Sequence, residues 1–170
     1  IEFHRQFTHS FIFIPFGGFI CGTFFYHVLT KRKGMSIKET YLYCTLAYAS
    51  HGILDACTSY GTQLFWPFND FRVAWNTISI VDPIFTITLF TLVFLSIFRR
   101  KTIFARIALI WVITYMSIGL IQHNRAERVG LLNADSRGHI PARIVVKPSL
   151  ANLLVWKVIY EADEKYYVDA

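Results

Sequence analysis

Apolar residues gather in four long runs that are separated by polar connections. These runs cover Phe11–Leu29, Tyr41–Ala56, Pro83–Phe98 and Ile107–Ile121. A helix that crosses a bilayer needs about 20 mostly apolar residues, and only the first run approaches that length without its flanks. The pattern predicts an all-α integral membrane helix bundle with about four transmembrane helices. The second run carries His51 and Asp55 and is the weakest of the four.

After His123 the pattern becomes that of a different kind of structure. The segment 124–143 is polar and contains the breakers Gly130, Gly138 and Pro141. Short runs typical of strands then follow, and they cover Ile144–Val146, Leu153–Tyr160 and Tyr166–Val168. We therefore expect a helical membrane domain over 1–123, with a polar linker and a small β-rich tail over 124–170. Two or three strands are marginal by themselves, so this tail should dock on the membrane domain.

Composition and charge exclude several classes of protein. The chain has 170 residues, of which 54% are hydrophobic and 16% are charged, with a net charge of +6. Disordered chains are polar and highly charged, and ordinary soluble domains carry about 25% charged residues. The positive charge alone would suggest nucleic acid as a partner. Its distribution among the connections favours membrane lipids instead.

The basic residues alternate between the connections. The first connection holds Lys31, Arg32, Lys33 and Lys38, the second only Arg72, and the third Arg99, Arg100 and Lys101, with Arg106 just inside the next run. The positive-inside rule places the first and third connections in the cytoplasm. The N-terminus, the loop 58–81 and the tail then lie outside. Solvated loop charges without topological meaning are the alternative. Aromatic residues in the loop 58–81 suggest that it lies along the membrane interface.

Six ionisable residues are expected at the outer membrane face. Such groups are costly near a bilayer and are therefore functional candidates. His4 and His9 precede the first run, His51 and Asp55 end the second, Asp82 opens the third, and His123 closes the fourth. The sequence thus predicts one cluster of metal-ligand residue types. His27 falls near the opposite face.

His51 and Asp55 form one pair within this set, although an isolated HxxxD pair is common. Residues four apart share one helix face, so an imidazole and a carboxylate at this spacing can bind one divalent metal. A hydrogen-bonded pair at a helix end is the alternative. His4 and His9 are five apart and converge only if the chain between them is not regular helix. Arg5, which lies between them, can bind a phosphate bidentately or contact lipid headgroups.

Asp82 and His123 have simpler explanations. Asp82 precedes Pro83, which is the arrangement of a helix N-cap followed by proline at the first helical position. Asp82 is also a weak candidate for a general base. His123 closes an apolar run, where it can snorkel towards the headgroups or interact with the helix C-terminus.

Two stretches resemble a known family. His4-Arg5-Gln6-Phe7-Thr8-His9-Ser10 and, some forty residues later, the segment from His51 to Phe68 are together similar to the YdjM/YbcI-type family of bacterial inner-membrane proteins. Members are described as membrane-bound metal-dependent hydrolases, sometimes as LexA-regulated, which would connect them with the SOS response. They look distantly similar to zinc-dependent phospholipase C and P1-type nucleases, which share an HxxxD ligand pair.

The resemblance implies a metal site, with zinc the expected ion, held by His4, His9, His51 and Asp55. Metal-assisted hydrolysis of a phosphoester or lipid-like substrate would follow, with Arg5 neutralising the phosphate and Asp82 as the possible base. The family pattern has an earlier hydrophobic helix and an acidic Pro-Asp-Leu-Asp-like motif, which this sequence lacks. Because the chain starts without Met and within a motif, we expect it to be N-terminally incomplete.

Three functional hypotheses remain open at this point. The first is the metal-dependent hydrolase facing the extracytoplasmic side of the inner membrane. The second is a non-enzymatic envelope-stress or partner-binding membrane protein whose His/Asp cluster is structural. The third is an ion or proton transporter that uses His51 and Asp55 as a relay, which is weak because few polar residues continue across the bilayer. The sequence does not indicate an oligomeric state.

Overall fold

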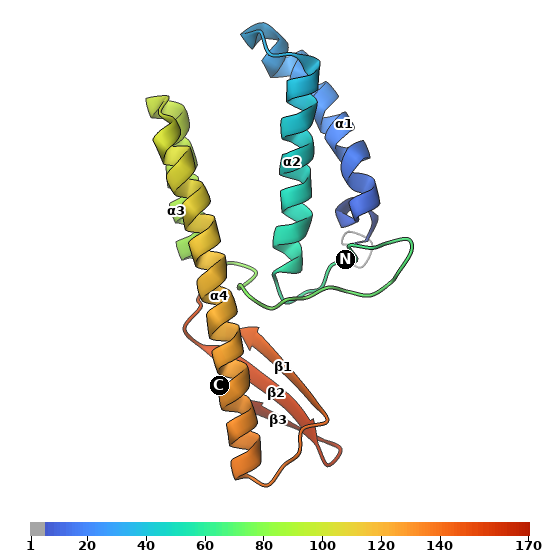
Figure 1. Ribbon diagram of the computed structural model, residues 1–170, viewed down its shortest axis with the longest axis vertical. Coiled ribbons are helices and arrows are strands. Elements are labelled where there is room, and N and C mark those ends of the chain that lie inside the picture. Colours follow the sequence, from blue (N-terminus) through green and yellow to red (C-terminus); the bar gives the residue numbers. More distant parts are fainter. Residues whose placement is uncertain (1–5) are drawn as a thin grey trace. The chain divides into compact units, whose positions relative to one another are not determined.

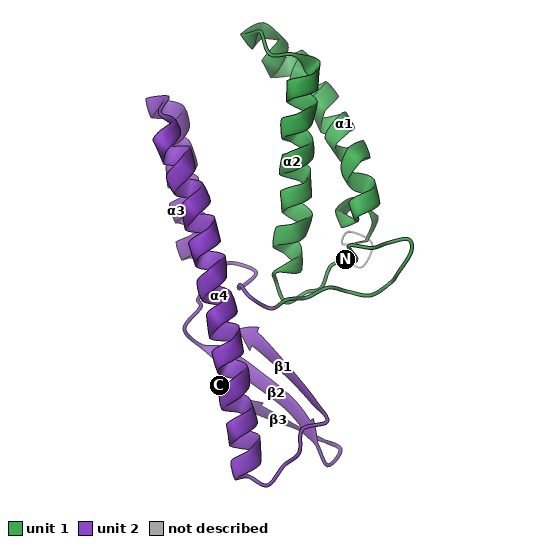
Figure 2. Ribbon diagram, viewed as in Figure 1, with its two compact units in different colours: residues 1–75 green, residues 76–170 purple. Residues whose placement is uncertain are grey.

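The computed structural model describes residues 6–170, which form four α-helices followed by a small sheet (Figure 1). The main elements are α1 (Ile14–Phe25), α2 (Ile37–Ala56), α3 (Pro83–Arg99), α4 (Thr102–Ser136), β1 (Arg143–Pro148), β2 (Trp156–Ala162) and β3 (Lys165–Asp169). The chain divides into two compact units, residues 1–75 and residues 76–170 (Figure 2). His4 and Arg5 lie outside the described residues.

The first unit is built on a helical hairpin of α1 and α2 (Figure 1). Three glycines of α1, at positions 17, 18 and 22, are buried and allow the two backbones to approach closely. A Cβ added to Gly22 would lie 3.0 Å from the Cα of Tyr41. The turn between the helices ends in a capping box, in which Ser36 and Glu39 satisfy each other's backbone N–H groups at the start of α2.

The segment after α2 folds back against the start of the chain. The backbones of Thr62 and Val73 exchange two hydrogen bonds of 2.9 Å, which closes a long loop. Leu64, Val73 and Ala56 form a small buried cluster beneath this loop. The backbone N–H of Phe11 donates to the carbonyl of Leu64 at 2.9 Å. The loop therefore anchors the residues that lead into α1.

The second unit combines the α3/α4 pair with a three-stranded antiparallel sheet of order β1-β2-β3. The sheet packs on the C-terminal half of α4, where Ala134, Tyr160 and Ala162 form a buried cluster. Arg137 donates to both carboxylate oxygens of Asp169, at 2.9 and 3.1 Å, and ties β3 to the end of α4. These hydrogen bonds lower the pKa of Asp169 below its usual range. The predicted tail is therefore a sheet docked on its own unit.

The polar segment after His123 was wrongly predicted as a linker. It continues α4 as far as Ser136. Gly130 is not a breaker but a contact point, because a Cβ added there would lie 2.5 Å from Cγ1 of Val158 on β2. Packing against the sheet outweighs the low helix propensity of glycine at this position.

Fewer helices qualify as membrane spans than the sequence pattern predicts. Within residues 6–170, two helical segments are long and apolar enough to span a bilayer, Phe11–Lys33 with 23 residues and Thr102–Ser136 with 35. The apolar helix α3 is shorter, with 17 residues. Helix α2 has 20 residues but is not among the candidate spans. The prediction of four transmembrane helices is therefore not confirmed.

Candidate functional site

Three of the predicted site residues meet at one end of the α1/α2 hairpin. His9 lies in the short 3₁₀ helix Phe7–His9, while His51 and Asp55 occupy the last turns of α2. Nε2 of His9 lies 3.1 Å from Nε2 of His51 and 3.9 Å from Oδ2 of Asp55. The fold thus brings His9 next to His51 and Asp55, although it lies far from them in the sequence. The membrane topology expected from the sequence predicts this arrangement.

Local backbone structure brings His9 to this position. The chain between Gln6 and Ile14 consists of two short 3₁₀ helices, not regular α-helix. Gly52 is buried against His9, and a Cβ added there would lie 3.1 Å from the His9 carbonyl oxygen. Glycine next to His51 therefore allows the two segments to approach. Tyr48 donates a hydrogen bond of 2.7 Å to the carbonyl of Thr8 and holds the same segment on α2.

Hydroxyl groups orient the side chains of the cluster. Oγ1 of Thr8 lies 2.9 Å from Nδ1 of His9, so it fixes the ring whose Nε2 faces His51. Thr62, which is fully buried, donates from Oγ1 to Oδ2 of Asp55 at 2.8 Å. His9 is 5% exposed, whereas His51 is exposed. The cluster is therefore anchored on its inner side and reachable from outside through His51.

The distances bear on whether a metal could be held here. Two nitrogen ligands about 2.0–2.1 Å from a tetrahedral zinc lie about 3.3 Å apart, which is close to the separation of the two Nε2 atoms. Oδ2 of Asp55 is somewhat farther away and is turned towards Thr62. Among residues 6–170, no group of three or more His, Cys, Asp or Glu side chains is arranged to hold a metal ion. The described part of the chain thus supplies two imidazoles at a separation compatible with a shared ion, with a carboxylate nearby.

Asp82 has a fully explained structural environment in the second unit. Its side chain caps α3 by accepting from the N–H groups of Ile84 and Phe85 at 3.1 and 3.2 Å. Its other oxygen accepts a 2.6 Å hydrogen bond from the hydroxyl of Tyr115, and the residue is 3% exposed. The N-cap prediction is confirmed. The role as general base stays a prediction.

Replacing Asp82 with alanine should destabilise the second unit. Loss of the cap and of the partner of a buried tyrosine hydroxyl should together cost about 2–4 kcal/mol. Unfolding of the purified variant in detergent micelles measures this cost. Unchanged stability of the variant would contradict the structural role.

His123 also has a structural contact. Its ring lies edge-on to Trp156, with centroids 5.9 Å apart, in the second unit. Thr62 and Gly52 carry no functional signal of their own in the sequence. Both fall in the family-like stretch from His51 to Phe68, but only the fold shows that one holds Asp55 and the other admits His9.

A family model described as YdjM inner membrane protein matches residues 1–126. The chain belongs to this family. The match includes His4, Arg5, His9, His51, Asp55 and Asp82. Together with the two candidate spans, membership makes this an inner membrane protein. Comparison with curated proteins and with solved structures found no match. The distant similarity to zinc-dependent phospholipase C therefore stays a prediction.

Proposed function

We propose that this YdjM-family protein is a membrane-embedded metal-dependent hydrolase that cleaves a phosphoester or lipid-like substrate at the outer face of the inner membrane. The observation that carries the proposal is the 3.1 Å separation of the Nε2 atoms of His9 and His51, with Asp55 beside them. His4, which the sequence adds to this set, lies outside the described residues. Zinc is the ion that two or three imidazoles and a carboxylate suit best.

The chain's own residues have separable tasks in this proposal. A divalent ion held by His9 and His51 would acidify a water ligand and stabilise charge that develops on the phosphoryl oxygens. Thr8 and Thr62 keep the His9 ring and the Asp55 carboxylate in place. Asp55 serves as a ligand or orients His51 from its position one turn later. Arg5 would pair with the phosphate of the substrate.

The loop that follows α2 supports a lipid-like substrate. It presents Phe65, Phe68, Phe71 and Trp75 as exposed side chains in the same unit as the cluster, and Phe68 is 83% exposed. Aromatic residues of this kind favour the headgroup region of a bilayer. A site beside such a loop would meet amphipathic molecules at the membrane surface.

A multi-pass topology completes the proposal. The alternation of basic connections predicts four crossings, with α2 and α3 as the two less apolar or shorter ones. Within the first unit, the basic turn 31–38 and the His51/Asp55 pair lie at opposite ends of α2 (Figure 1). A cytoplasmic turn would therefore put the cluster on the extracytoplasmic side.

A structural His/Asp cluster in a non-enzymatic membrane protein is the second candidate. A distance of 3.1 Å also suits a direct hydrogen bond between two neutral imidazoles, and Thr62 already satisfies one oxygen of Asp55. This alternative needs no metal.

Metal content separates the two candidates. We expect the full-length protein, purified in detergent after incubation with zinc, to retain about one zinc ion or more per chain. The His51→Ala variant should lose it, whereas His27→Ala, at the other end of the hairpin, should retain it. Elemental analysis gives the ratio. Absence of stoichiometric metal in the unmodified protein, or equal retention by both variants, would contradict the proposal.

A further inference from the structure

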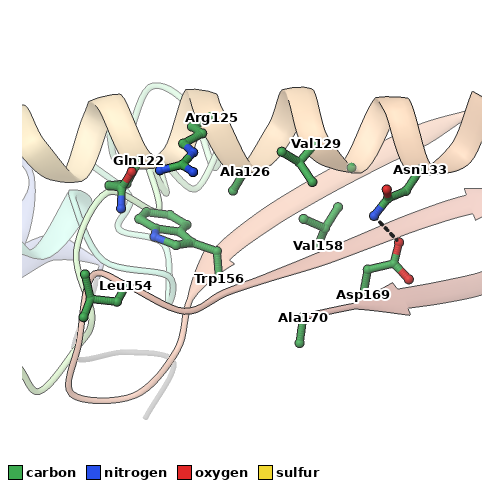
Figure 3. Close-up of a pocket in the computed structure, with 11 residues that line it drawn as sticks. Gln122, Arg125, Ala126, Val129, Asn133, Leu154, Trp156, Val158, Asp169 and Ala170 are labelled. Carbon is green, nitrogen blue, oxygen red and sulfur yellow. Dashed lines mark hydrogen bonds between the residues drawn. The ribbon is translucent and has the colours of Figure 1, made fainter.

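The second unit contains a cavity of about 260 Å³ between the C-terminal half of α4 and the sheet (Figure 3). Gln122, Arg125, Val129 and Asn133 line it from the helix, and Leu154, Trp156, Val158 and Asp169 line it from the sheet and its loop. In Figure 3, Gln122, Arg125 and Trp156 lie towards one end, and Asn133 and Asp169 lie towards the other. The volume is slightly below that of cavities for drug-sized ligands, so it suits a headgroup and not a whole lipid.

Among the side chains that line this cavity, the charge left without a partner is positive. Asp169 is neutralised by two hydrogen bonds from Arg137, and Asn133 donates to it as well, at 3.4 Å. Arg125 is exposed, and within residues 6–170 its guanidinium has no hydrogen bond or ion pair. One unmatched guanidinium at the cavity therefore favours an anion, and its planar fork matches the oxygens of a phosphate.

The same end of the cavity marks the level at which α4 leaves the apolar region. The apolar stretch of α4 ends at Ile121, and Arg125 follows about one turn later. Nε2 of Gln122 donates to the carbonyl of Leu153 at 3.4 Å, which holds the β1–β2 loop at this level. In that loop, Leu150 is 73% exposed and Leu154 is 83% exposed. Apolar side chains so exposed beside the end of a candidate span are suited to lipid acyl chains.

We propose that this cavity binds the phosphodiester headgroup of an anionic phospholipid in the leaflet at the C-terminal end of α4. The guanidinium of Arg125 pairs with the phosphate, Gln122 and Trp156 border the headgroup, and Leu154 contacts the first methylenes of an acyl chain. A zwitterionic lipid would bring a second cation next to Arg125, so an anionic lipid is preferred. This site is independent of the hydrolase proposed for the first unit.

The test uses the full-length protein in a neutral detergent with a chelator present, so that any hydrolysis is suppressed. Native mass spectrometry follows titrations with phosphatidylglycerol, with phosphatidylcholine of the same acyl chains, and with glycerol phosphate. We expect phosphatidylglycerol to bind more tightly than both others. Arg125→Gln should weaken it about tenfold, the effect of one charge-assisted hydrogen bond.

Arg128→Gln is the matched control. It removes the same charge from the same exposed helix segment but does not line the cavity. Its affinity for phosphatidylglycerol should stay within about twofold of the unmodified protein. Equal losses in the two variants, or equal binding of the two lipids, would overturn the proposal. Glycerol phosphate that binds as tightly as the lipid would also overturn it, since the site would then take a soluble anion.

Discussion

Under the proposed function, the His51→Ala variant should lose phosphodiester hydrolysis by more than about 100-fold, because loss of the proposed metal ligand exceeds the 10–100-fold cost of losing an outer hydrogen-bond partner. The Nε2 atom of His51 is one of only two imidazole nitrogens that meet in the described part of the site. Hydrolysis of bis(p-nitrophenyl) phosphate and of short-chain phosphatidylglycerol, with zinc added, measures the loss. Rates equal to those of the unmodified protein would contradict a catalytic role for the cluster.

Substitutions of two threonines near Asp55 should change the hydrolysis rate to different extents. Thr62→Val removes the hydroxyl that donates to the Asp55 carboxylate and should cost about 10–100-fold. Thr58→Val is the matched control, because the hydroxyl of Thr58 donates to the backbone carbonyl of Asp55 and not to its side chain. The control should keep its rate within a few fold while the first variant does not. Equal effects would show that the loop acts only through its folding.

The four helices and three strands could be predicted from the sequence, but several of their ends could not. The start of α2 has a visible signal, since Ser36 and Glu39 form a capping box that the run starting at Tyr41 misses. The end of α4 has none. Gly130 is typical of a break, and only the packing of Val158 against it explains why the helix continues. Tertiary contact decides that position, so local propensity fails there.

The meeting of His9 with His51 could be predicted from the sequence, because it follows from the order and direction of the helices. Two antiparallel helices return His51 to the level of His9, which explains why residues far apart in sequence meet. The support around them was not predictable, because Thr62 and Gly52 have ordinary spacing and acquire their roles from the fold. The sequence also contains a signal for close packing of α1 against another helix. Gly18 and Gly22 form a GxxxG motif, the pattern of close helix contact in membranes.

Gly18→Leu should strongly destabilise the first unit. A Cβ at this position would lie 2.9 Å from the Cα of Thr45, well inside the ordinary carbon contact distance of about 3.5–4.0 Å. Because backbone cannot yield as a side chain can, the helices must separate, at a cost of about 3 kcal/mol or more. His9 lies just before α1 and His51 belongs to α2, so separating the helices should also reduce the zinc that the proposed site retains. Unfolding by denaturing detergent and zinc content measure the two effects.

The control and the rescue distinguish helix packing from a general effect of substitution. Phe19→Leu changes a neighbouring residue that is 62% exposed and should leave both stability and zinc content nearly unchanged. Thr45→Ala removes the hydroxyl oxygen that lies nearest to a Cβ added at Gly18, and this hydroxyl is buried without a hydrogen-bond partner among residues 6–170. Gly18→Ala should therefore be less harmful with Thr45→Ala than alone, by about 1 kcal/mol in a double-mutant cycle. Purely additive effects would show that contact with the Thr45 side chain does not set the cost of a larger residue at position 18.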